Sequence, residues 1–355
     1  MDVGINFFPD VSPEQKQADL YFQECLQIAE DADRLGYHHV RTVEHYFEPY
    51  GGYSPNPLLF LTAVAQRTQR VRLITGAVLP AFNHPLKLAG EIGMLDALSL
   101  GRLEVGFARA FLPHEFSRFG VSLDESRARF DEGLEAVRRL LEKEQVTLDG
   151  RFHRFPPVTS LPRPTQRPRP PFWIAAVSTE QSFVNAGRLG HGLMAIPLLG
   201  TTMRPMLDAY RDAWRAAGHQ GSGRVMLAFH MFCHQDGSAA LAIARDPINR
   251  YMATLVTAAS GWVEGVSSAD YPGYAQMIAA IKRDSFDTVL AHGGAWVGSP
   301  REILEQARAY QAQVGGFEVA SLQVNFATMA YDDARRSVEL FAHEVLPALQ
   351  ADAVT

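Results

Sequence analysis

Short runs that suit buried β-strands alternate with longer runs of helical periodicity along nearly the whole chain, and this alternation limits the possible fold most. The strand-like runs occupy eight stretches, at residues 2–8, 37–44, 71–80, 102–108, 172–177, 191–196, 224–233 and 319–326. A helical run follows each of them. About eight strand–helix cycles predict an α/β protein with a single (β/α)8 TIM barrel, and the alternative is an open doubly wound sheet.

The first helical run shows the periodicity clearly. Tyr21, Cys25, Ile28 and Ala32 lie four and three residues apart, which places them on one apolar helix face, and Gly36 is a typical stop. Further helices are predicted over 56–68, around 88–95, over 130–141, up to 189, over 201–217, from 237, over 299–313 and from 331.

Two stretches depart from this rhythm. Residues 146–170 form an insertion, in which 147–155 suggests a hairpin and the proline-rich stretch that begins at 161 suggests an extended connector. Residues 261–298 have no clear periodicity and are expected to be an irregular, mobile loop region. Because the cycle resumes after both, the chain is predicted to form one domain over residues 1–355.

Composition narrows the class of protein. The 355 residues are 47% hydrophobic and 20% charged, which is enough apolar material for a large core. The net charge is −6 without a basic run, so a nucleic-acid partner is not expected. Cys25 and Cys233 lie far apart, as in proteins of a reducing compartment. The sequence has no signal-peptide pattern and no apolar run near the roughly 18 residues of a membrane span, so a cytoplasmic location is expected.

A polar cluster stands where the second strand is expected to end. Glu44, His45 and Tyr46 open a long loop rich in glycine and proline. Reactive groups of (β/α)8 barrels occupy the carboxyl ends of strands and the loops after them. Each residue alone also fits a polar strand end without a function, but the three together favour a catalytic site.

Candidate anion-binding groups follow two other strands. Arg109 ends the fourth strand, Arg127 lies in the first turn of the helix after it, and Ser178 and Thr179 follow the fifth strand where a helix should begin. Guanidinium groups, hydroxyls and free helix N-terminal amides together suit a phosphate.

Each of these residues has an ordinary structural alternative. Arg127 could pair with Asp124 or Asp131 on its own helix, and Ser178 could be only an N-cap. The convergence of three elements at one barrel end favours the phosphate site.

Small residues end the third strand, and several catalytic motifs are missing. Thr75, Gly76 and Ala77 would let a flat ring approach the backbone, although a packing role for the glycine is equally open. The sequence contains no phosphate loop, no hydrolase nucleophile elbow and no zinc-protease motif. No metal site is predicted, and a metal-dependent barrel hydrolase is kept as a minor alternative.

Several blocks of the chain together resemble the bacterial luciferase-like flavin monooxygenase family. They are "VEHYF" (43–47), "GAVLP" (76–80), "HPLKLAGEIGMLDALSLGRLEVGFARAF" (84–111) and "FGVSLDESRARFDEGLEAV" (119–137), with further similarity at "PPFWIAAVST" (170–179) and "VGSPREI" (297–303). The resemblance implies a (β/α)8 barrel that uses FMN as FMNH2 supplied by a flavin reductase. It also implies oxygenation of the substrate by a flavin C4a-hydroperoxide.

The resemblance assigns roles to individual residues. His45 matches the catalytic histidine beside the flavin, with Glu44 as its neighbour and Tyr46 on the substrate side. The FMN phosphate is matched by Arg109, Arg127, Ser178 and Thr179. A non-proline cis peptide is implied near Gly76–Ala77, beneath the ring, and 261–298 matches the mobile active-site loop.

This chain differs from the luciferase pattern at two positions, and two alternative functions remain. Many luciferase subunits have a second histidine where this chain has Tyr46, and a reactive cysteine where it has Ala108. We therefore expect oxygenation of a small organic or carrier-protein-bound substrate without light emission. The family habit implies a homodimer. The rivals are an F420-dependent hydride-transfer oxidoreductase and a non-catalytic flavin-binding protein.

Overall fold

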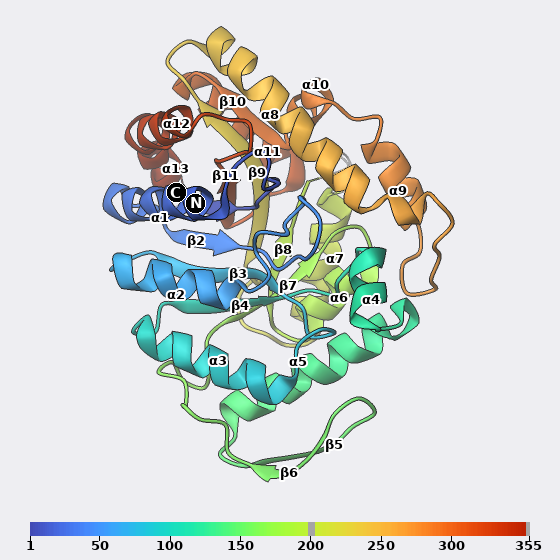
Figure 1. Cartoon of the computed structure of the whole chain (residues 1–355). Coiled ribbons are helices and arrows are strands. Elements are labelled where there is room, and N and C mark those ends of the chain that lie inside the picture. Colours follow the sequence, from blue (N-terminus) through green and yellow to red (C-terminus); the bar gives the residue numbers. More distant parts are fainter. Residues whose placement is uncertain (198–202, 353–355) are drawn as a thin grey trace.

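The computed structural model describes residues 1–197 and 203–352 and contains a closed parallel barrel (Figure 1). Neighbouring strands of the wall pair in sequence order, and β11 pairs with β1 to close the ring. The strands of the wall are β1 (Asp2–Phe7), β2 (His39–Thr42), β3 (Arg72–Val78), β4 (Leu103–Phe107), β7 (Phe172–Ala176), β8 (Gly192–Ala195), β9 (Val225–Cys233) and β11 (Val319–Gln323). The predicted (β/α)8 barrel is confirmed, and the open sheet is wrong.

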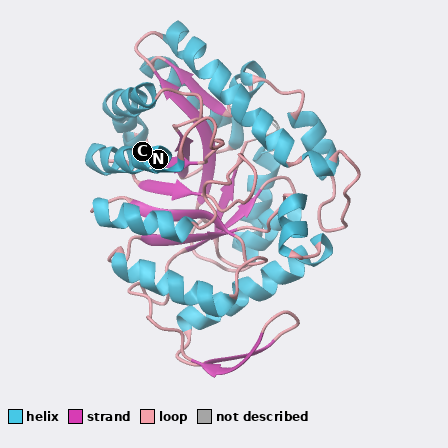
Figure 2. Ribbon diagram, viewed as in Figure 1, coloured by secondary structure: helices cyan, strands magenta, loops and turns pink. Residues whose placement is uncertain are grey.

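Helices surround this barrel (Figure 2). They are α1 (Ala18–Leu35), α2 (Pro57–Arg67), α3 (Pro85–Leu98), α4 (Pro113–Phe119), α5 (Ser126–Glu142), α6 (Glu180–Arg188), α7 (Met203–Ala216), α8 (Gly237–Ala258), α11 (Pro300–Val314), α12 (Tyr331–Glu344) and α13 (Leu346–Ala351). The first two residues of the helix predicted over 201–217 lie outside the described residues.

Local sequence explains several helix ends. Helix α1 ends at Gly36, whose φ of 87° lies in the left-handed region that favours glycine. Asn56 caps α2 by accepting a hydrogen bond from the backbone N–H of Leu59. Ser299 and Glu302 form a reciprocal capping box at the start of α11. These local signals explain why the alternation of strands and helices could be predicted from the sequence.

The hairpin expected in the insertion is present. Strands β5 (Val146–Asp149) and β6 (Arg154–Val158) pair antiparallel and project from the barrel beside α5 (Figure 1). The Glu132 carboxylate of α5 accepts hydrogen bonds from the backbone N–H groups of three turn residues, Arg151, Phe152 and His153. One helix side chain therefore holds the hairpin turn against the barrel.

The irregular structure expected over 261–298 is wrong from residue 274 onwards. This part contains α9 (Tyr274–Ile281), α10 (Phe286–Ala291) and β10 (Ala295–Gly298), and a short 3-10 helix, η3 (Ser260–Trp262), lies before it. Tyr274, Met277, Ile278 and Ile281 are buried at helical spacing, but an eight-residue helix is too short for a strong periodic signal. Strand β10 pairs with the second half of the long strand β9.

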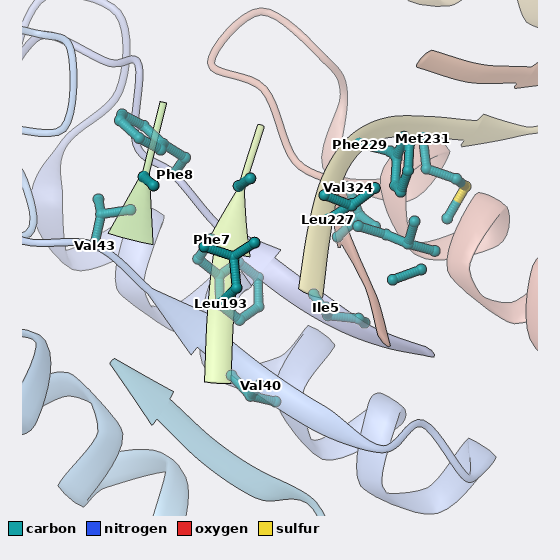
Figure 3. Packing of buried hydrophobic residues seen from close by; sticks show 14 of the residues in the cluster. Ile5, Phe7, Phe8, Val40, Val43, Leu193, Leu227, Phe229, Met231 and Val324 are labelled. Carbon is teal, nitrogen blue, oxygen red and sulfur yellow. The ribbon is translucent and has the colours of Figure 1, made fainter. Parts of the chain in front are cut away.

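Two sets of buried apolar side chains alternate along the strands. Residues such as Val40, Leu193 and Leu227 pack in the large cluster that also contains helix residues (Figure 3). A small cluster contains only strand residues, namely Ile74, Trp173, Met194, Met226 and Val319. Because successive strand residues face opposite sides, the small cluster lies inside the barrel and the large one between barrel and helices.

Within the described ranges, none of the helices combines the length and the apolar character that a membrane span requires.

Candidate active site

A cleft with about 830 Å³ of empty space opens at the carboxyl ends of β2, β3, β4 and β7. This is the end at which (β/α)8 barrels carry reactive groups. Seven of the ten residues predicted from the sequence line it, namely Glu44, His45, Gly76, Ala77, Ala108, Arg109 and Thr179. The other three, Tyr46, Arg127 and Ser178, are not part of its wall.

His45 reaches the cleft from the loop after β2 and is held from behind by a carboxylate. Its Nδ1 lies 3.0 Å from Oε1 of Glu115, a fully buried residue of α4. The same oxygen accepts a hydrogen bond of 2.9 Å from the backbone N–H of Tyr46. A carboxylate on Nδ1 fixes the ring orientation and the tautomer, which leaves Nε2 for proton transfer.

The sequence analysis missed Glu115. It lies 70 residues from His45 along the chain, in a seven-residue helix without a distinctive motif. Only the packing of α4 against the loop after β2 brings the two side chains together.

Glu44 lies beside His45 but has different partners. Its carboxylate accepts hydrogen bonds from the Tyr46 hydroxyl at 2.6 Å, the Asn83 amide at 2.8 Å and the Leu79 backbone N–H at 3.0 Å. Burial raises the pKa of Glu44 to about 7, although these three bonds oppose the shift. The protonated form of Glu44 is therefore more favoured near neutral pH than that of an exposed glutamic acid.

Tyr46 supports Glu44 from outside the cleft. Its hydroxyl donates to Glu44, and its ring packs edge-on against Phe119 with the ring centres 4.8 Å apart. We therefore place Tyr46 behind the acid and not on the substrate side.

The floor of the cleft at β3 contains the expected cis peptide between Gly76 and Ala77. The carbonyl of Gly76 accepts a hydrogen bond of 3.0 Å from Nη2 of Arg41. A Cβ atom at position 76 would collide with the Arg41 side chain, so glycine is required here. Ala108, in the position expected for a reactive cysteine, lies in the same wall.

Two of the predicted phosphate residues, Arg109 and Thr179, lie in the wall of this cleft. A second cavity, of about 1530 Å³ including its open mouth, shares Arg109, Ala175 and Ser182 with the cleft and adds Arg127. It also contains Arg188 of α6, which the sequence analysis missed. Burial raises the pKa of Asp131, and the charges of Arg127, Arg109 and Arg188 oppose this shift. All three guanidinium groups therefore line one cavity and act on the Asp131 carboxylate.

Asp270 occupies the N-terminus of α5 in this structure. Its carboxylate accepts hydrogen bonds from the backbone N–H of Arg127 at 3.0 Å and the Ser126 hydroxyl at 3.2 Å. Its Oδ1 lies 3.7 Å from Nε of Arg127, and its carbonyl accepts a bond of 3.0 Å from Arg109. The sequence alternatives for Arg127, a pair with Asp124 or Asp131, are replaced by this contact with Asp270.

The loop after β7 contributes Thr179. Its Oγ1 is buried and has no hydrogen-bond partner among the described residues. Thr179 is also the N-cap position of α6, so the alternative that Ser178 is the cap is wrong. Ser178 lines neither cavity.

These residues fit a flavin mononucleotide. Three guanidinium groups and the unpartnered hydroxyl of Thr179 suit a phosphate, and the small residues Gly76, Ala77, Ala108, Ala175 and Ala176 leave room for a flat ring. The described ranges contain no group of three or more His, Cys, Asp or Glu side chains that could hold a metal ion.

Comparison with known families gives one match, to the model described as luciferase-like monooxygenase, over residues 1–315. The crystal structure of monooxygenase RslO1 from Streptomyces bottropensis is 45% identical, with a TM-score of 0.88, and the alignment covers 98% of this chain and 100% of that one. The oxygenase component of the flavin-dependent trigonelline monooxygenase of Acinetobacter baylyi is 29% identical, over 97% of this chain and 94% of the relative.

Two more distant structures share the fold alone. The oxygenating constituent of the 3,6-diketocamphane monooxygenase of Pseudomonas putida, a type II Baeyer–Villiger enzyme solved with FMN, is 21% identical, with a TM-score of 0.82 and coverage of 98% of both chains. An F420-dependent secondary alcohol dehydrogenase is 15% identical, with a TM-score of 0.74 and coverage of 98% of both chains.

Proposed function

Because this chain belongs to the luciferase-like monooxygenase family, we propose that it is the oxygenase component of a two-component flavin monooxygenase. It would use FMN, reduced by a separate flavin reductase, to oxygenate a small organic or carrier-protein-bound substrate. The observation that carries this proposal is the shared cavity wall, in which Arg109 of the cationic side and His45 of the catalytic side line one cleft.

The cationic side would hold the FMN phosphate. Arg109, Arg127 and Arg188 supply the positive charge, and the Thr179 hydroxyl supplies a buried hydrogen-bonding group without a partner in the described chain. This assignment replaces the expected Ser178 by Arg188. Charge-assisted bonds of this kind position a cofactor as well as bind it.

His45 would move the proton. Glu115 accepts the hydrogen bond from Nδ1 and so keeps Nε2 turned to the cleft as base or acid. An imidazole can both accept and donate a proton, which suits proton transfer to and from substrate oxygen. Glu44 would form hydrogen bonds with polar groups at the edge of the cofactor, and its raised pKa favours the protonated form, which can donate such a bond.

Apolar walls would keep water away from the reacting atoms. Ala108, Ala110, Phe111, Ala175 and Ala176 line the cleft. Reduced FMN, when bound, would activate oxygen. The protein would orient the cofactor, set the polarity around it and exclude water from the cleft. With Ala108 and Tyr46 in place of the expected cysteine and histidine, we propose that no light is emitted.

The partners and location follow from the same proposal. We infer a flavin reductase as partner, since the relative from Acinetobacter baylyi is described as an oxygenase component. A homodimer and a cytoplasmic location remain part of the proposal, and the free thiols of Cys25 and Cys233 are compatible with a reducing compartment.

The deciding experiment compares cofactors directly. The protein is titrated with FMN and with F420, and the reduced complexes are then mixed with 18O2 and a panel of ketones, phenols and heteroaromatic acids. We expect FMN binding and one labelled oxygen atom in a product. F420 binding with hydride transfer and no label would contradict the proposal, and FMN binding without any turnover would support a non-catalytic flavin protein.

A further inference from the structure

Arg41 is a buried cation that none of the proposed steps uses. It lies in the middle of β2, is 5% exposed, and faces the barrel interior, because its neighbour Val40 packs in the outer cluster. Its Nη2 donates to the carbonyl of Gly76 at 3.0 Å, while its Nε is buried without a partner among the described residues.

No described carboxylate neutralises this guanidinium. None lies within ion-pairing distance of it in the described ranges, whereas the partly buried Arg72 pairs with Glu104 at 2.7 Å. Burial lowers the pKa of Arg41 to about 10, so the group is still charged at neutral pH. The titratable side chains whose charges interact with it include those of Tyr251, Tyr50 and His39.

An isolated buried charge is costly for a fold. Removing one partner of a buried pair strongly destabilises a protein, because the remaining charge has no compensation. A chain that keeps such a charge inside its barrel has a reason beyond stability, and a ligand that brings the missing negative charge is the simplest one.

The position of Arg41 shows where that ligand would lie. Arg41, Tyr50 and Gly76 all line the same cleft as His45. The missing Cβ at position 76 leaves the space that the Arg41 side chain occupies beside β3. Together with the hydrogen bond to the Gly76 carbonyl, this contact makes the cation part of the cleft wall.

We propose that Arg41, with Tyr50 in the same wall, forms an anion-binding subsite in the floor of the cleft, for a planar, delocalised anion. Resting on the proposed function, two sources have this chemistry: the anionic ring edge of reduced FMN, and the carboxylate or enolate of the organic substrate. Arginine suits both, because its planar guanidinium matches delocalised oxygen and nitrogen acceptors.

The variants Arg41→Met and Arg41→Lys test the subsite. Methionine removes the charge and keeps much of the length, and lysine keeps the charge. Arg67→Met, at the exposed end of α2, is the control for loss of a positive charge elsewhere. The thermal midpoint of each variant is measured first, since a merely structural arginine would make Arg41→Met clearly less stable, whereas an unpaired buried cation would not.

One arm measures the binding of oxidised and of anaerobically reduced FMN. If the anion is the flavin, Arg41→Met weakens binding of reduced FMN about tenfold more than that of oxidised FMN, which lowers the two-electron potential of bound FMN by ~30 mV. Arg41→Lys restores most of the difference, and Arg67→Met behaves as wild type.

The other arm uses benzoate as a probe of the protein without flavin. If the anion belongs to the substrate, Arg41→Met weakens benzoate binding about tenfold and leaves the FMN ratio unchanged. Unchanged values in both arms would overturn the subsite. Because the benzoate arm needs no flavin, a wild-type protein that fails to bind FMN would remove the proposed function and still leave this arm to decide the role of Arg41.

Discussion

Glu44 and Glu115 are both buried carboxylates beside His45, yet their partners give them different tasks. Glu115 contacts the imidazole itself, whereas Glu44 turns to Tyr46, Asn83 and the backbone of Leu79. Adjacent residues of an extended segment point to opposite sides, so the side chains of Glu44 and His45 have different neighbours. Substitutions of Glu44 and of His45 therefore test separate parts of the proposal.

We expect His45→Ala to lower product formation by about 100-fold or more, the usual contribution of a general acid or base, with FMN affinity within twofold of wild type. The residue lines the reacting part of the cleft and not the arginine-rich part. Coupled assays with a reductase, together with a fluorescence titration of FMN, measure both quantities. Unchanged turnover would remove His45 from the mechanism.

The pKa of Glu44 leads to a prediction about pH. Since burial raises this pKa to about 7 in the folded protein, the folded state binds the proton more tightly than the unfolded state. The stabilising effect of protonated Glu44 is complete below the ordinary value of 4.5 and is lost as the pH rises through about 7. Relative to Glu44→Gln, the wild type should lose up to about 3 kcal/mol between pH 4.5 and pH 8.

Urea denaturation of both proteins at several pH values measures this difference, and the comparison removes the parallel effect of Asp10, whose pKa burial also raises to about 7. A difference between the two proteins that stays constant with pH would show that Glu44 titrates normally.

At the scale of elements, the segment before α9 is fastened to the start of α5. Asp270 binds the α5 N-terminus, Tyr271 lies under the guanidinium of Arg109 with 4.6 Å between the group and the ring centre, and Trp262 donates to the carbonyl of Phe111. The residues proposed to bind phosphate are thus held by a carboxylate that competes for the same charges. Loading of the cofactor and the position of this segment are therefore linked.

We expect Asp270→Asn to bind FMN about two- to fivefold more tightly, because a negative charge at a helix N-terminus is worth about 0.3–1 kcal/mol and would no longer oppose the phosphate. Asp124→Asn is the control, since Asp124 holds the same segment through Ser268 but does not contact Arg127. Equilibrium dialysis at low salt gives the affinities. Weaker binding in Asp270→Asn would mean that the carboxylate organises the arginines.

At the scale of the whole molecule, the long strand β9 connects three neighbours. It pairs with β8 and β11 along its first half and with β10 along its second. Phe229 in this strand is 2% exposed and stacks on Trp296 of β10 with 4.2 Å between ring centres. Figure 3 shows Phe229 beside Met231 and Val324 in the outer core.

We expect Phe229→Ala to lower the free energy of unfolding by about 3–5 kcal/mol, the usual effect of emptying a buried phenylalanine site. Tryptophan fluorescence during urea unfolding measures this change. The exposed Phe47, replaced by alanine in the same way, should change stability by less than about 1 kcal/mol. Equal effects at both positions would contradict the described packing.

The alternation that defines the barrel could be predicted because it is local. All eight wall strands fall within the predicted runs, since the pattern of each run spans only a few residues. Glu115, Arg188 and Asp270 could not be predicted, because their roles depend on contacts between elements far apart in the chain, 70 residues for Glu115 and 143 for Asp270. The helices α9 and α10 were not predicted, because each is too short to give a clear periodic pattern.

The close contact between Arg41 and Gly76 has an evolutionary consequence. A Cβ atom at position 76 would overlap with Nε of Arg41, so a larger residue there requires the Arg41 side chain to move. Alanine or serine at 76 should therefore be tolerated better in relatives that lack arginine at 41. Under the proposed role of Arg41, such a paired exchange would mark branches in which the preferred substrate or the electronic tuning of the cofactor has changed.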